Sequence, residues 1–213
     1  MLGIKSMKIH KILFILIFAV SSIACSTEPD YEKYDKQLID SFLDKAALRE
    51  LRDALTRDLK TYPGDERLLH TRLMVNGGLG DHESRAADIY RLAELFPSSI
   101  LYQFESCGTQ ERMNGYSEHA VQCYSGVLAL YENTIHKDKL RLNSLYVVTA
   151  LLAKSPDAKK LQESFIREAG DSPSLCTEVE LLRHFDRKYF VAGEESPGAN
   201  YERCLRMMLD YKE

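Results

Sequence analysis

Histidine and cysteine side chains in the middle of the chain are of the types that bind zinc. His119 and Cys123 are separated by about one turn of a helix, and Cys107 precedes them in the chain. Structural zinc sites have four such ligands, and we identify no fourth ligand for this set. In an oxidising compartment the two cysteines would instead form a disulfide. We therefore expect neither a metal nor another cofactor at these residues.

Catalytic motifs of defined spacing are absent from the sequence. It contains no G-x-S-x-G, no G-x-x-x-x-G-K and no H-E-x-x-H, which are typical of hydrolases, nucleotide-binding proteins and zinc peptidases. The glycine-rich stretch GGLGDHES at 77–84 lacks the third glycine of a phosphate-binding loop, and we interpret it as an interhelical turn with Asp81 as the helix cap. We predict that the protein is not an enzyme and assign no catalytic residue. A hydrolase with an unrecognised site is the alternative.

The N-terminal segment 1–24 has the pattern of a secretory signal. Three lysines precede the apolar run ILFILIFAV at 12–20, and small residues follow it. A membrane-spanning helix needs about 20 apolar residues, so this run is too short to span. Translation from Met7 would leave the same signal and the same mature chain.

The residues SIAC at 22–25 resemble the lipobox of bacterial lipoproteins, although Ser22 stands where that family usually has leucine. The resemblance implies that residues 1–24 are cleaved, that Cys25 carries the lipid, and that residues 25–30 form the lipidated cysteine and a tether. Ser26 occupies the position where inner-membrane lipoproteins usually have aspartate, which implies anchoring in the outer membrane, facing the periplasm. Several acyl chains would hold the protein firmly on the bilayer. The alternative is ordinary signal-peptide cleavage that leaves Cys25 as a free thiol.

The mature chain is acidic. The segment 1–24 carries three of the 28 basic side chains and none of the 32 acidic ones, so the formal net charge changes from −4 to −7 when it is removed. This balance argues against nucleic acid as a partner. A chain of this length buries about 70% of its unfolded surface in one core, and we expect residues 31–213 to form a single domain.

Four cysteines remain when Cys25 is set aside, and they fall into two close pairs along the chain. We predict that Cys107 pairs with Cys123, and that Cys176 pairs with Cys204. In the loop-entropy model each disulfide would stabilise the fold by about 3 to 4 kcal/mol.

Helical spacing of apolar residues recurs along the chain after the tether, for example at Leu48, Leu51, Leu55 and Leu59. Proline and glycine separate the helical segments, and Ser155-Pro156 and Ser172-Pro173 have the pattern of helix starts. We therefore predict an all-α fold of about ten helices, each roughly 11 to 19 residues long.

Three pairs of similar residues recur at one spacing, a period of about 34 residues. They are Pro63 and Pro97, Ala86 and Ala120, and Tyr90 and Tyr124. Together with Phe104-x-x-Cys107-Gly108, this period resembles the tetratricopeptide repeat, most clearly over residues 67–131. The resemblance implies a solenoid of stacked antiparallel helical hairpins, in which Gly108 and Ala120 lie at the closest approach of two helices. Phe104 and Tyr124 would fill the space beside them, and Ala86 and Tyr90 would repeat this packing one hairpin earlier. The alternative is a non-repetitive helical bundle.

Surface recognition is the function that these observations favour. Helical repeats usually bind peptides, loops or domains, and tyrosine is favoured at interfaces; Tyr102, Tyr116, Tyr131 and Tyr146 are candidates, although each is equally well explained as half-buried. We expect a lipid-anchored periplasmic module that binds another protein, most simply an inhibitor or immunity protein that neutralises a toxic enzyme of the cell envelope. Degenerate repeats, two disulfides and an acidic surface suit one tight partner. The alternative is a scaffold for outer-membrane, pilus or peptidoglycan assembly.

Overall fold

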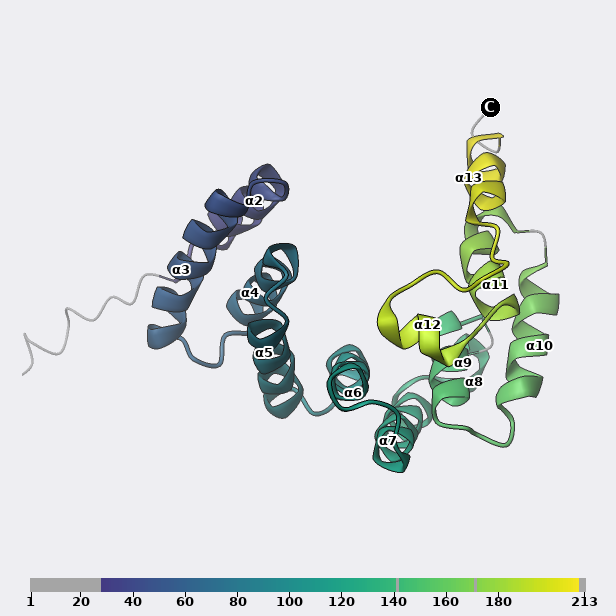
Figure 1. The fold of residues 1–213 in the computed structure, drawn as a ribbon. Coiled ribbons are helices and arrows are strands. Elements are labelled where there is room, and N and C mark those ends of the chain that lie inside the picture. Colours follow the sequence, from purple (N-terminus) through teal and green to yellow (C-terminus); the bar gives the residue numbers. More distant parts are fainter. Residues whose placement is uncertain (1–27, 141, 171, 211–213) are drawn as a thin grey trace, which may run out of the picture.

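The computed structural model describes residues 28–140, 142–170 and 172–210, and within these ranges it contains helices and no strand (Figure 1). The predicted all-α class is thus confirmed. The signal segment and Cys25 lie outside the described residues. None of the described helices is long and apolar enough to cross a membrane.

The helices become shorter toward the C-terminus. Their bounds are α2 Tyr31–Ser41, α3 Lys45–Thr61, α4 Glu66–Leu79, α5 His82–Leu95, α6 Ile100–Asn114, α7 Glu118–Thr134, α8 Lys137–Leu140, α9 Ser144–Leu152, α10 Ala158–Ala169, α11 Cys176–Arg183, α12 Arg187–Ala192 and α13 Tyr201–Asp210, with a 3₁₀ turn at Pro173–Leu175. The predicted range of helix lengths is correct for α2 to α7 and for α10. It is wrong for α8, α9 and α11 to α13, which are shorter.

Capping side chains set most of the helix starts. Asp44, Asp65 and Asp81 each accept a hydrogen bond from a backbone N–H in the first turn of the following helix, which satisfies donors that have no partner inside the helix. The Asp81 cap confirms the interpretation of GGLGDHES as an interhelical turn, although the turn is confined to residues 80 and 81 because Gly77 and Gly78 lie within α4. Gly80 ends α4 with a φ of 73°, a left-handed conformation that favours glycine.

The two predicted Ser-Pro helix starts have different outcomes. Pro173 is the first residue of the 3₁₀ turn that precedes α11, so the position of this start is confirmed, but Ser172 makes no capping hydrogen bond to it. The start at Ser155-Pro156 is wrong, because α10 begins at Ala158 with Asp157 before it.

Consecutive helices pack against one another in chain order from α2 to α7, and α7 packs against α9. In Figure 1 the chain forms an arc from α2 and α3, through α6 and α7, to α10, α11 and α13. The short helix α12 departs from this order. It folds back to contact α6, on the inner side of the arc.

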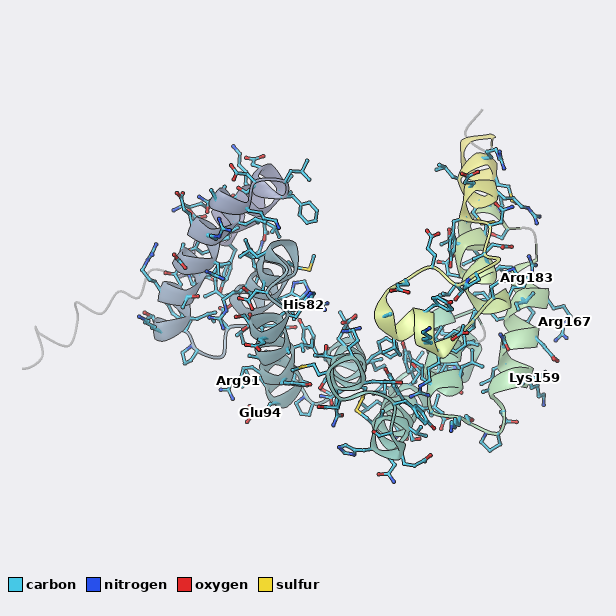
Figure 2. All side chains as sticks on the ribbon, viewed as in Figure 1. His82, Arg91, Glu94, Lys159, Arg167 and Arg183 are labelled. Atoms are coloured by element: carbon cyan, nitrogen blue, oxygen red, sulfur yellow. A yellow bond between two sulfur atoms is a disulfide. The ribbon has the colours of Figure 1, made fainter. Side chains whose placement is uncertain are left out.

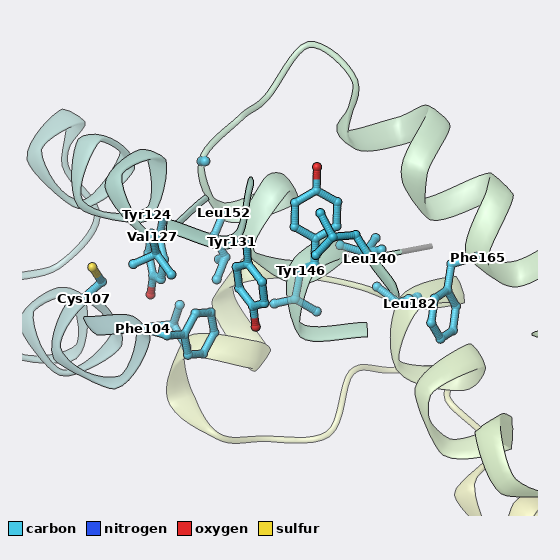
Figure 3. Packing of buried hydrophobic residues seen from close by; sticks show 14 of the residues in the cluster. Phe104, Cys107, Tyr124, Val127, Tyr131, Leu140, Tyr146, Leu152, Phe165 and Leu182 are labelled. Carbon is cyan, nitrogen blue, oxygen red and sulfur yellow. The ribbon is translucent and has the colours of Figure 1, made fainter. Parts of the chain in front are cut away.

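Two hydrophobic clusters share α6 between them. The first lies within α2 to α5 and includes Tyr102 of α6; the second runs from Phe104 of α6 to α12. Figure 3 shows the second cluster, in which the rings of Phe104 and Tyr124 are 5.7 Å apart and those of Tyr131 and Tyr146 are 5.5 Å apart. Since residues 102 and 104 of one helix enter different clusters, α6 joins the two halves of the arc.

Both predicted cysteine pairs lie at disulfide-bonding distance. Cys107 and Cys123 connect α6 to α7 with a Cα–Cα distance of 5.7 Å. Cys176 and Cys204 connect α11 to α13 with a Cα–Cα distance of 5.3 Å. The second pair links α13 to α11, and α13 also packs against the 3₁₀ turn at Pro173–Leu175.

The residues assigned to repeat packing have mixed outcomes. Ala86, Phe104, Ala120 and Tyr124 are buried. Tyr90 is 38% exposed, and its assignment to the packed interior is wrong because it lies on the side of α5 where its hydroxyl is 4.0 Å from Met113 Sδ. Gly108 is buried, but its nearest neighbours are the Tyr124 hydroxyl and the Arg112 guanidinium, at 3.5 and 3.6 Å from the position of an added Cβ. Gly108 therefore faces side chains and not the backbone of α7, so its predicted role as the residue that lets the two backbones touch is wrong, although α6 and α7 do approach closely beside it at Cys107 and Cys123, with a Cα–Cα distance of 5.7 Å.

Of the four tyrosines considered for an interface, three are buried. Tyr102, Tyr131 and Tyr146 belong to the hydrophobic clusters, which excludes them as interface residues. Tyr116, in the turn between α6 and α7, is 51% exposed and remains a candidate.

Candidate functional site

Adjoining hollows lie where α12 folds back on α6, and we call them the α12 hollows. The first, of about 390 Å³, lies between the start of α5, the middle of α6 and the end of α12. The second, of about 510 Å³, lies between the end of α6, Tyr116 and α12. The third, of about 350 Å³, lies between α5 and α6. Helices that are distant in sequence thus form one continuous, irregular face.

Arg112 on α6 borders all three hollows. Its guanidinium donates to Thr109 Oγ1 at 3.0 Å and to the backbone carbonyl of Val191 at 3.3 Å. Since Val191 belongs to α12, this contact connects α6 to α12 and holds the arginine head group at the junction of the hollows.

Arg85 on α5 lies opposite Arg112 of α6. Arg85 Nη2 lies 3.5 Å from Glu105 Oε2, and Arg112 Nη2 lies 4.0 Å from the same oxygen. All three side chains are about one-third exposed. Two guanidinium groups therefore share a single carboxylate at the edge of the first and third hollows.

Arg187, the first residue of α12, secures this helix to the rest of the protein. Its Nε and Nη2 donate to the two carboxylate oxygens of Glu111 at 2.7 and 2.9 Å, and its Nη1 donates to the Leu152 carbonyl at 2.6 Å. The guanidinium also lies 4.8 Å from the centre of the Tyr116 ring and 5.6 Å from that of Tyr124, distances typical of cation–π contacts. Glu111 is 4% exposed at its side chain, so this pair is largely removed from water.

Burial raises the pKa of Tyr124, which borders the first hollow. Desolvation, and then the charge of Glu111, raise the pKa of its hydroxyl above the ordinary tyrosine value. The hydroxyl is therefore protonated at physiological pH. Tyr124 is fully buried, so it borders the hollow without offering exposed ring surface.

The hollows bring together some of the residues singled out in the sequence. Phe104, Gly108 and Tyr124 line the first hollow and Ala86 lines the third, while Ala120 is buried in α7. Cys107 and Cys123 lie beside them in the α6–α7 pair, and Cys176 and Cys204 lie elsewhere, in α11 and α13. His119 lies on α7, and the described residues contain no group of three histidine, cysteine or acidic side chains arranged to hold a metal.

Several residues of this face were missed by the sequence analysis. Arg85, Arg112 and Arg187 carry no motif, and Arg187 is 76 residues from its partner Glu111. A periodicity argument detects contacts within and between neighbouring helices, and no signal in the sequence indicates that α12 returns to α6.

A separate polar cluster lies between α4 and α5, away from α12. The buried carboxylate of Asp88 accepts from Arg72 at 2.5 Å and from Asn76 Nδ2 at 2.9 Å. Asn76 Oδ1 is buried and has no hydrogen-bond partner among the described residues. We interpret this cluster as structural, because its charged groups are paired with each other between two packed helices.

Comparisons with protein-family models, with curated proteins and with solved structures give no match. Chemically, the α12 hollows offer guanidinium groups, the exposed ring of Tyr116, the partly exposed ring of Phe190 and aliphatic side chains. Arginine, tyrosine and methionine are the residue types enriched in protein–protein interfaces.

Proposed function

We propose that this protein binds another protein with the face that contains the α12 hollows. The observation that carries the proposal is the continuity of these hollows across α5, α6 and α12, with exposed Met113 and Tyr116 beside them. A surface of this extent and composition fits a folded partner, whose side chains enter several depressions at once, better than it fits a single small molecule.

We further propose that the partner is a toxic enzyme of the cell envelope, which this protein inhibits. The supporting features are an acidic mature chain, two cysteine pairs that rigidify α6–α7 and α11–α13, and an Arg187 contact that fixes α12 in place. A preorganised surface loses less conformational entropy on binding, which favours tight association with one partner. An assembly scaffold is the alternative function.

The test uses the enzyme encoded beside this gene. If that enzyme is a secreted phospholipase, amidase or nuclease, the chain from residue 26 onward should abolish its activity at a one-to-one ratio. Met113→Asp should weaken inhibition at least about tenfold, because it places a charge in the interface. Ile39→Asp on α2 is the matched control, since Ile39 is 77% exposed and Met113 is 57% exposed; it should inhibit like the wild type. Envelope-assembly genes as neighbours, with no enzyme inhibited, would support the scaffold instead.

The location that we propose is the periplasmic side of the outer membrane, through lipid on Cys25. The support is the lipobox-like sequence at 22–25. Growth with a palmitate analogue should label the wild type and leave Cys25→Ser unlabelled. Label retained by Cys25→Ser would contradict the anchor, while the binding proposal would be unaffected.

A further inference from the structure

Arg85 and Arg112 are held less closely by their shared carboxylate than Arg187 is by Glu111. Arg85 and Arg112 approach Glu105 only to 3.5 and 4.0 Å, whereas Arg187 bonds Glu111 at 2.7 and 2.9 Å. Charge-assisted hydrogen bonds between a guanidinium and a carboxylate are normally about 2.7 to 2.9 Å long. The two guanidinium groups are thus close to a carboxylate without forming short bonds to it.

The space beside this pair is suited to a carboxylate on an aliphatic stem. The first hollow is about 390 Å³ in volume, and its accessible apolar surface comes from the partly exposed ring of Phe190 and from Ala192, because Phe104 and Tyr124 beside them are buried. The positive groups stand at its edge, only partly exposed, where charge interactions are screened less than on an open surface. An Asp or Glu side chain can place its methylene groups against Phe190 and its carboxylate between the guanidinium groups of Arg85 and Arg112.

We propose that Arg85 and Arg112 receive an Asp or Glu side chain of the protein partner, and that Glu105 competes for the same two guanidinium groups. This inference rests on the proposed protein-binding function and specifies the chemistry of the partner at one point. Arg85, Arg112 and Glu105 together carry a net charge of +1. The chain without residues 1–24 has a formal net charge of −7, because that segment holds three of the 28 basic and none of the 32 acidic residues. The site is therefore a local cationic position on an acidic protein.

A peptide titration tests the site without the partner. The probe is the blocked tripeptide glycyl-glutamyl-glycine, with its glutamine counterpart as the neutral control, added at constant ionic strength to ¹⁵N-labelled chain from residue 26 onward, which holds every described helix. The Nε–Hε resonances of Arg85 and Arg112 should shift when the glutamate peptide is added and should not shift when the glutamine peptide is added. Inorganic phosphate at the same concentration should cause smaller shifts, because Phe190 can contact the methylene stem of the glutamate peptide and phosphate has no such stem.

Variants with opposite expected signs separate the proposal from general damage. Arg85→Gln should lower the affinity for the glutamate peptide about tenfold, which is the effect of one lost charge-assisted hydrogen bond. Glu105→Gln should raise the affinity for the glutamate peptide, because the carboxylate that competes for the two arginines is gone. Arg91→Gln is the matched control: it lies on the same helix, at the opposite end from His82 (Figure 2), and pairs with Glu94 at 2.7 Å.

Each outcome has a definite meaning. Equal shifts with the glutamine peptide, stronger binding of phosphate, or unchanged affinity of Glu105→Gln would each overturn the acidic-side-chain site. Such a result would leave the inhibition assay of the proposed function untouched. Conversely, a failed inhibition assay with a specific response of Arg85 and Arg112 to the glutamate peptide would keep the site and reject the inhibitor.

Discussion

Replacing Arg187 by methionine should destabilise the protein strongly, because Glu111 would lose its cation inside the fold. Glu111 is only 4% exposed at its side chain and receives two of the three hydrogen bonds that Arg187 donates. Removing one partner of a buried ion pair costs about 3 to 5 kcal/mol, since an uncompensated charge stays in a poorly solvated place. An exposed pair would cost at most about 1 kcal/mol.

Urea unfolding of the non-reduced chain, followed by circular dichroism, measures this cost. With an m-value of about 1 to 3 kcal/mol/M, the midpoint should fall by about 1 M or more. The double variant Arg187→Met with Glu111→Gln should recover part of the loss, because the buried charge is removed with its partner. A loss below about 1 kcal/mol for Arg187→Met, or no recovery in the double variant, would refute the description of Arg187 as the contact that fixes α12.

Three further predictions concern stability and use the same unfolding assay. Asp88→Ala should cost about 3 to 5 kcal/mol because it leaves the partly buried guanidinium of Arg72 without its carboxylate; a cost near zero would contradict the structural role of this cluster. Gly108→Ala should stabilise by about 0.5 to 1 kcal/mol, because alanine is the better helix former and the added Cβ would make ordinary contacts at 3.5 and 3.6 Å; destabilisation would instead show that Gly108 itself packs against the backbone of α7. Burial, and then a hydrogen bond to Asp58, raise the pKa of Tyr34 to about 12, and burial raises that of Tyr131 to about 12. The folded state holds these protons more tightly than an unfolded chain, in which the tyrosine pKa is about 10. The stabilisation that Tyr34 and Tyr131 contribute is therefore complete below pH 10 and is lost as the pH rises through 12. An unchanged urea midpoint between pH 8 and pH 11 would contradict this prediction.

The parts of the fold that follow from local sequence were predictable. Helical spacing at Leu48, Leu51 and Leu55 indicated a helix because these side chains share one face of α3 and are buried together. The cysteine pairs were predictable for a similar reason: each joins segments close in sequence, and Cys107 and Cys123 lie on consecutive helices.

The parts that depend on distant contacts were not predictable. For Tyr131 and Tyr146 the sequence did not decide between the surface and the interior, because the pattern within one helix does not show that α9 packs on α7 and brings the two rings together. The site depended on such contacts even more. Arg187 reaches Glu111 across 76 residues, so the hollows exist only once α12 has folded back, and no repeat or motif marks that return.

Site-specific photo-crosslinking in living cells tests the central claim, that the α12 hollows bind a protein partner. Benzoylphenylalanine would replace Tyr116 beside the second hollow and, as control, the exposed aromatic Phe42 after α2. We expect an adduct of defined mass from position 116, containing the enzyme encoded by the neighbouring gene, and none from position 42. An adduct from position 42 alone, or no adduct from position 116 while the partner is present, would contradict the claim.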